Sequence, residues 1–148
     1  MDIAFVAVLF VLIAGLGVGI QSPLIGMLSS RLGPLEAVFV VHVGGAILSG
    51  IPLLFLLGGK LGAWQSVPWY AFLAGGFGVL IVSSIGFAIP RVGVANATVA
   101  LIVAQLLVAA IIDHFGWLGA NVRQFDLVRM AGFVLLLTGA WLVIRPAA

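Results

Sequence analysis

The sequence contains no cysteine and few charged residues. Charged side chains make up 7% of its 148 residues, and hydrophobic side chains make up 64%. Soluble domains usually carry about 25% charged residues. Without cysteine, the chain has no disulfide, no thiol nucleophile and no cysteine metal ligand. Six basic and four acidic residues cannot cover the surface of a water-soluble domain of this size, so the composition predicts an integral membrane protein.

Other chemistries lack the residues that they need. The six Lys and Arg residues lie singly along the chain, whereas a nucleic acid backbone is bound by clustered basic residues. Neither histidine has an acidic cluster beside it, which excludes a metal site of ordinary spacing. No serine has a histidine and a carboxylate placed to activate it. We therefore expect no enzyme activity, no cofactor, no metal and no nucleic acid partner.

Long apolar runs fill most of the chain. A membrane-spanning helix needs about 20 predominantly apolar residues. The first run follows no basic segment and exceeds the apolar core of a signal peptide, so we expect it to be retained as a span. We predict an all-α membrane protein that is a single five-helix transmembrane domain over residues 1–148, with helices at about 3–30 (kinked at Pro23), 35–57, 68–89, 94–112 and 127–144.

The basic residues are balanced across the predicted spans. Cytoplasmic loops normally carry an excess of Lys and Arg, and this excess sets the orientation. With five spans, one side of the membrane holds three basic residues and the other side also holds three: Lys60, Arg123 and Arg129 against Arg31, Arg91 and Arg145. An odd number of spans with balanced charge suits an antiparallel dimer, because two copies in opposite orientations form the inverted repeat of many secondary transporters. The alternative is a single orientation, set by a partner chain or by finer effects of the loops.

Glycine is abundant, with 20 residues concentrated inside the spans. The run that holds Gly15, Gly17 and Gly19 resembles a nucleotide-binding loop, but no strand precedes it and no soluble helix follows it. In membrane helices, small residues allow close packing or leave room beside a cavity. We expect one of these two roles for Gly15, Gly17, Gly19, Gly132 and Gly139.

Two polar side chains of the first two spans are predicted at similar depth. Gln21 lies ten residues before Arg31, about 15 Å from that membrane face, and His42 lies eight residues after Pro34, about 12 Å from the same face. Polar groups at this depth are costly and usually functional. The two side chains are therefore candidates to hydrogen-bond to each other or to line one cavity. Imidazole changes charge near neutral pH, which makes His42 a candidate for proton coupling; a histidine that only bonds between helices is equally consistent.

Gln105 and Asn96, in the fourth span, complete the candidate substrate pathway. Gln105 lies eight residues before Asp113, about 12 Å from the opposite membrane face. Gln21 and Gln105 can also serve as interhelical hydrogen-bonding groups, so both roles remain open. Asp113 closes the fourth span, where it is either a structural anchor, which we favour, or the acid of a gate.

Short motifs spread over nearly the whole chain resemble a known family. They are Gln21-Ser22-Pro23-Leu24 with the Leu32-Gly33-Pro34 turn, Pro90-Arg91-Val92-Gly93-Val94, Ala104-Gln105-Leu106-Leu107 with Ile112-Asp113-His114-Phe115-Gly116, and Gly132 with Gly139 in the last span. On these residues the chain resembles the short YdcZ-type members of the drug/metabolite transporter superfamily. It departs from the family pattern at Ile25, where asparagine is common, and at Ala104, where glycine is frequent.

The resemblance implies five-helix halves that pair into a ten-helix, inverted-repeat transporter of the bacterial inner membrane. We therefore expect a secondary transporter of a small molecule that works by alternating access as an antiparallel, dual-topology homodimer. Gln21, His42 and Gln105 of both copies would line a cavity near the dimer axis. The alternative is a non-transporting accessory subunit, or one half of a heterodimeric transporter.

Overall fold

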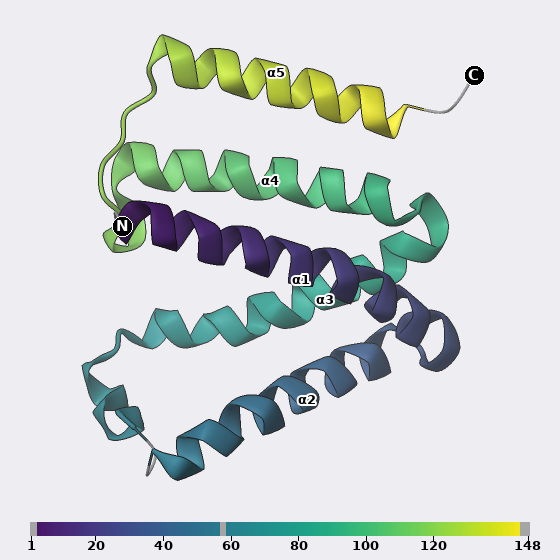
Figure 1. The fold of residues 1–148 in the computed structure, drawn as a ribbon, viewed down its shortest axis with the longest axis vertical. Helices are drawn as coiled ribbons and strands as arrows, with labels where there is room; N and C mark the ends of the chain where they lie inside the picture. The colour runs from purple at the N-terminus through teal and green to yellow at the C-terminus, as the bar shows by residue number, and fades with distance from the viewer. Residues whose placement is uncertain (1–2, 57–58, 146–148) are drawn as a thin grey trace. The chain divides into compact units, whose positions relative to one another are not determined.

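The computed structural model describes residues 3–56 and 59–145, and it is helical throughout its regular parts (Figure 1). The chain divides into two compact units, residues 1–91 and residues 92–148. Five helices are long and apolar enough to cross a membrane.

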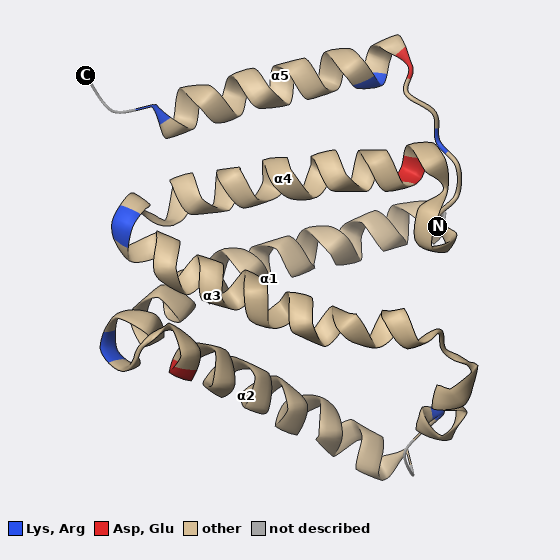
Figure 2. Cartoon of the chain, turned by 180° about the vertical axis from the view of Figure 1, so that it is seen from behind, with Lys and Arg blue, Asp and Glu red and all other residues tan. Residues whose placement is uncertain are grey.

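The helices follow from the apolar runs, because a backbone in lipid must satisfy its hydrogen bonds within its own segment. Charged residues interrupt no run. Figure 2 shows the described Lys, Arg, Asp and Glu residues at helix ends and in loops, with the middle of each long helix uncharged. These helix ends are where side chains can reach the polar headgroup layer.

The first unit begins with a helical hairpin. Helix α1 spans Ile3–Leu32 and helix α2 spans Pro34–Phe55. Only Gly33 separates them. Its backbone φ is 114°, a value that residues other than glycine rarely adopt. Pro34 starts α2 at a position where its missing N–H costs nothing. The turn therefore needs both residues of the Gly33-Pro34 pair.

The rest of the first unit is two short 3₁₀ helices, Leu61–Ser66 and Trp69–Leu73, and helix α3 at Ala74–Val92. The predicted third helix, 68–89, differs at both ends: its first turns are 3₁₀, and Pro90 lies inside the helix instead of ending it. Pro90 is tolerated inside the last turns of α3 because its fixed φ is compatible with a helix. Its missing N–H removes only one backbone hydrogen bond. The guanidinium of Arg91 donates to the carbonyl of Phe87, at 2.6 Å, in this last turn.

The other helix ends also differ from the predicted bounds by a few residues. Helix α1 continues past residue 30 because the turn begins only at Gly33. The predicted second helix ran to residue 57, which lies outside the described residues; α2 itself ends at Phe55.

Small residues bring α1 and α3 together. A Cβ added at Gly26 of α1 would lie 2.6 Å from Cγ2 of Ile89 on α3. A Cβ added at Gly86 of α3 would lie 3.0 Å from Oγ of Ser29 and 3.6 Å from Cγ2 of Ile25, both on α1. The backbones approach at these points because glycine presents no side chain, as is common between membrane helices.

The second unit is an antiparallel pair of helices, α4 at Val94–Phe115 and α5 at Leu127–Ile144 (Figure 1). Helix α4 exceeds its predicted end at 112 by three residues because its C-terminal cap is Gly116, whose φ of 66° ends the helix. A short 3₁₀ turn, Trp117–Gly119, and an extended segment lead to Asp126, the N-cap of α5. Helix α5 has the bounds that the sequence predicts.

Few apolar side chains are buried. In the described part of the chain they are Ile25, Ala37, Val38, Ile85, Ala110 and Ala140, and large apolar residues are exposed along every long helix. Such surfaces are unstable in water but suit contact with lipid or with another apolar protein surface.

Candidate functional site

The predicted polar residues divide between the two units. Gln21 and His42 lie on α1 and α2 of the first unit, and Asn96 and Gln105 lie on α4 of the second. Both glutamines are exposed, whereas His42 and Asn96 are half-buried. Each of these side chains can therefore contact a group outside its own helix.

His42 is oriented by its own helix and faces α3. Its Nδ1 lies 2.8 Å from the carbonyl oxygen of Val38. A carbonyl only accepts, so Nδ1 must donate, and in the neutral ring Nε2 then carries the lone pair. A Cβ at Gly78 of α3 would lie 2.9 Å from Nε2. Gly78 therefore makes room for a ring nitrogen that can accept a proton.

Gln21 does not bond to His42. No hydrogen bond joins the two side chains, and the Gln21 side chain makes no other hydrogen bond among residues 3–56 and 59–145. The neighbouring Ser22 is buried and donates to the carbonyl of Val18 at 2.8 Å. The structure therefore leaves the Gln21 amide free at the surface of its unit.

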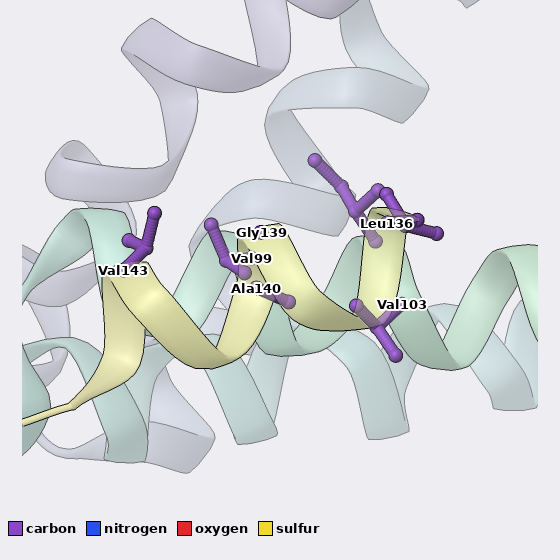
Figure 3. Close-up of a pocket in the computed structure, with 7 residues that line it drawn as sticks. Val99, Val103, Leu136, Gly139, Ala140 and Val143 are labelled. Carbon is purple, nitrogen blue, oxygen red and sulfur yellow. The ribbon is translucent and has the colours of Figure 1, made fainter. Parts of the chain in front are cut away.

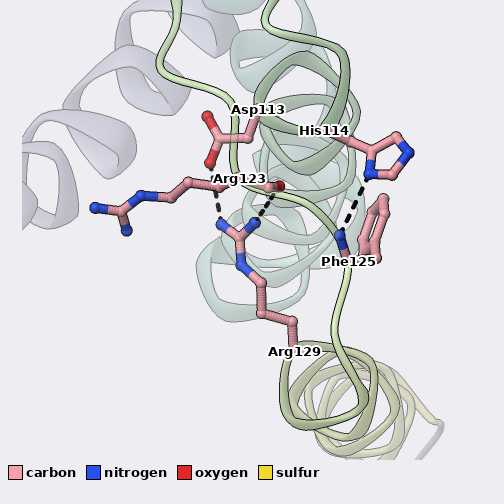
Figure 4. Close-up of polar contacts among 5 residues, drawn as sticks. All are labelled: Asp113, His114, Arg123, Phe125 and Arg129. Carbon is pink, nitrogen blue, oxygen red and sulfur yellow. Dashed lines mark hydrogen bonds and ion pairs between the residues drawn. The ribbon is translucent and has the colours of Figure 1, made fainter.

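Asp113 forms an ion pair at the end of α4. Its Oδ2 lies 3.0 Å from an Arg129 nitrogen, and the two side chains are 33% and 30% exposed (Figure 4). The second terminal nitrogen of Arg129 donates to the Arg123 carbonyl at 2.9 Å, and the Arg123 N–H donates to the Asp113 carbonyl at 2.8 Å. One guanidinium thus fastens the end of α4 and the loop to the first turn of α5.

Two further contacts hold the same loop. The Phe125 N–H donates to Nδ1 of His114 at 3.3 Å, and the two rings lie 5.1 Å apart (Figure 4). Because Nδ1 accepts, the neutral His114 ring carries its proton on Nε2. The Asp126 carboxylate accepts from the Arg129 N–H at 2.7 Å, which caps α5. These contacts give Asp113 the geometry of an anchor.

The candidate glycines have open space around them. A Cβ added at any of Gly15, Gly17, Gly19, Gly132 or Gly139 would meet no atom within 4 Å outside its own helix. Gly139 lines an apolar cavity of about 340 Å³ between α4 and α5, together with residues that include Val99, Val103 and Ala140 (Figure 3). Gly132 lines a neighbouring cavity of about 350 Å³ that also touches Arg129.

Two close contacts were not predicted from the sequence. They involve Gly26 and Gly86, which the sequence alone does not distinguish from the other glycines. A polar cavity in the first unit was not predicted either; it has a volume of about 460 Å³ and is lined by Ser29, Ser30, Pro34, Gly86, Pro90 and Arg91. One feature of the sequence could have indicated this cavity: Ser29-Ser30 and Pro90-Arg91 lie near helix ends on the same predicted membrane face.

Among the described residues, no three His, Asp or Glu side chains lie close enough to hold a metal ion.

Residues 6–142 match the family described as "Putative inner membrane exporter, YdcZ". The chain is similar to the inner membrane protein YdcZ of Escherichia coli strain K12, with 25% identity over 139 residues that cover 92% of this chain and 93% of the relative. No solved structure matches the chain. The family match covers most of the sequence and includes all five candidate spans in whole or in large part. The chain therefore belongs to the YdcZ family and is an inner membrane protein.

Proposed function

We propose that this protein exports a small molecule across the bacterial inner membrane by alternating access, as an antiparallel homodimer. The match of residues 6–142 to a family of inner membrane exporters carries the proposal of export. Five candidate spans and the scarcity of charged side chains inside them are consistent with a chain that works entirely within the bilayer (Figure 2).

The balance of basic residues supports the antiparallel dimer. Each side of a five-span layout holds three Lys or Arg residues, so neither orientation is favoured by the charges that normally set topology. An inverted pair of five-helix chains has the symmetry on which alternating access depends in many secondary transporters. The same pairing would cover apolar helix faces that a single copy leaves exposed.

The exposed polar groups support a pathway between the two copies. A glutamine amide that faces hydrocarbon is costly, and Gln21 and Gln105 are both exposed in a single chain. A second copy would place these amides, together with Asn96, at a protein surface or a water-filled cavity. Nε2 of His42 is the proton-accepting group of this pathway, and Asp113 is an anchor held by Arg129.

Topology is the first experiment, and the absence of cysteine makes it direct. We would introduce one cysteine, either as Ala120→Cys or after Ala148, and label intact and lysed cells with a membrane-impermeant maleimide. Dual insertion predicts that about half of the molecules are labelled from outside at each site. Labelling of one site only, with the other fully protected, would refute the homodimer and favour a heterodimer with a partner of opposite topology.

Gln105 tests the pathway within the same framework. We expect Gln105→Leu to slow solute release from vesicles that contain the dimer, while Gln124→Leu, in the α4–α5 loop, has no effect. The solute would be the first member of a small-molecule panel whose release the wild-type protein accelerates. Equal release by the two variants would remove Gln105 from the pathway, and no release of any solute by the wild-type dimer would favour an accessory subunit.

A further inference from the structure

The first unit contains a cavity whose lining has a chemistry unlike the apolar surface around it. It lies where the C-terminal end of α1, the N-terminal end of α2 and the C-terminal end of α3 meet, and it has a volume of about 460 Å³. That volume is within the range of small-molecule sites, about 300–1,000 Å³. Three of its six lining residues carry polar or charged side chains: Ser29, Ser30 and Arg91.

Ser29 combines burial with an unbonded hydroxyl, unlike the other helical serines; Ser84 also makes no side-chain hydrogen bond within the described residues, but it is exposed. The hydroxyls of Ser22, Ser30 and Ser83 each donate to the carbonyl four residues earlier, which is how a serine is satisfied inside an apolar helix. Ser29 is only 8% exposed, yet its hydroxyl makes no hydrogen bond within the part of the chain that the structure describes.

The Ser29 oxygen is open to the cavity. In the described residues, no side-chain polar atom that is sealed from solvent lacks a hydrogen-bond partner. Since the Ser29 oxygen has no partner, it is not sealed, and the cavity is the space that its residue lines. The hydroxyl is therefore an accessible donor on a residue that is otherwise buried and that lines a polar cavity.

Arg91 supplies a cation with unused donors. One guanidinium nitrogen donates to the Phe87 carbonyl at 2.6 Å, and the guanidinium carbon lies 3.6 Å from the centre of the Phe87 ring. These contacts hold the guanidinium against Phe87, which is next to the lining residue Gly86 in the sequence, and use one of its five N–H donors in a hydrogen bond. Arg31 and Glu36 lie at the same helix ends, so the formal charge there, with Arg91, is two positive and one negative.

We propose that this cavity binds a phosphate group, held by the guanidinium of Arg91 and the hydroxyl of Ser29. A guanidinium with several free N–H groups suits a phosphate oxyanion, and the Ser29 hydroxyl adds a donor from a different helix, α1. The N-terminus of α2 at Pro34 adds favourable polarity for an anion. The phosphate belongs to a lipid headgroup or to a soluble molecule. The site is separate from the proposed pathway and does not depend on transport or on dimer formation.

The test measures ligand-dependent melting of the full chain in a neutral detergent, read by tryptophan fluorescence. The two probes are phosphatidylglycerol in mixed micelles, and inorganic phosphate at constant ionic strength with chloride as the reference anion. A response to phosphatidylglycerol alone assigns the site to a lipid headgroup. A response to inorganic phosphate, with competition against phosphatidylglycerol, assigns it to a soluble phosphate-bearing molecule.

Variants separate the site from general electrostatics. We expect Arg91→Gln to weaken binding of the active probe about tenfold or more, and Ser29→Ala about fivefold. The matched control is Arg31→Gln, which removes an exposed arginine from the same helix-end region without touching the cavity lining; its affinity should stay within about twofold because an exposed charge in water contributes little without direct contact. The unliganded melting temperature of each variant reports its folding.

Two results would overturn the proposal. One is a wild-type protein whose melting temperature responds to neither probe. The other is an equal loss of affinity in Arg31→Gln and Arg91→Gln, which would mean that the probe senses only the net charge of this end of the unit.

Discussion

The approach of α1 to α3 rests on Gly26, and one added methyl group tests it. A Cβ at this position would lie 2.6 Å from Cγ2 of Ile89 and 3.1 Å from its Cβ. Both atoms are close to the Ile89 backbone, and a β-branched side chain has little rotamer freedom in a helix. Gly26→Ala therefore requires a movement of α3 or a strained Ile89 rotamer, and such overpacking costs about 1–3 kcal/mol.

Gly76→Ala on α3 is the matched control. A Cβ there would meet no atom within 4 Å outside its own helix. Both substitutions replace glycine by alanine inside a helix, which by itself stabilises by about 0.5–1 kcal/mol. The difference between the two variants therefore isolates the contact, and we expect Gly26→Ala to be the less stable of the two by about 1–3 kcal/mol.

The assay is unfolding in mixed micelles, followed by helical circular dichroism as a denaturing detergent replaces a mild one. Ile89→Ala removes Cγ2, so the double variant Gly26→Ala/Ile89→Ala should lose less free energy of unfolding than the sum of the single variants. A double-mutant cycle reports this coupling. Equal stabilities for Gly26→Ala and Gly76→Ala, with no coupling to Ile89, would refute the close approach of the two helices.

Three further predictions concern the second unit. Asp113→Asn should expose the α4–α5 loop to faster proteolysis and destabilise the unit by about 0.2–1 kcal/mol at low salt. Arg123→Gln should have neither effect, because Arg123 contributes only backbone atoms to the contacts. Equal cleavage rates for the two variants would contradict this prediction. Asp126→Ala should cost about 1 kcal/mol of unfolding free energy through loss of the α5 cap, and unchanged stability would show that the cap is not needed. Gly139→Leu should leave the melting temperature of the chain in micelles unchanged or higher, because its side chain enters a cavity of about 340 Å³; a lower melting temperature would mean that this cavity is filled in the folded protein.

Apolar runs were sufficient to predict the five helices, because length and composition decide which segments can cross a membrane. The exact ends depended on local backbone geometry. Gly33 and Gly116 end α1 and α4 through positive φ values that the sequence only suggests. Pro90 was expected to end a helix but lies inside α3. A proline in a membrane helix is therefore a weak boundary signal, since neighbouring groups can compensate for its missing N–H.

The contacts within the candidate site were harder to predict, because apolar residues surround each of these helices and no amphipathic face reveals its rotation. For this reason the sequence did not distinguish Gly26 and Gly86, which pack closely, from Gly15, which has open space around it. The partner of Asp113 was also hidden, since Arg129 lies sixteen residues away across a loop. Spacing from Pro34 predicts a membrane depth for His42, whereas the direction of its Nε2 required the α2–α3 geometry.

The helices of this chain do not match the bilayer equally. Helix α1 has 30 residues and α5 has 18, which at about 1.5 Å per residue gives lengths of about 45 Å and 27 Å. The hydrocarbon layer is about 30 Å thick. Helix α5 fits with little tilt, whereas α1 must tilt or extend its last turns into the headgroups. A change in membrane thickness therefore acts first on α1, so the lipid composition of the host membrane becomes a mechanical variable for the helix that carries Gln21 and Ser29.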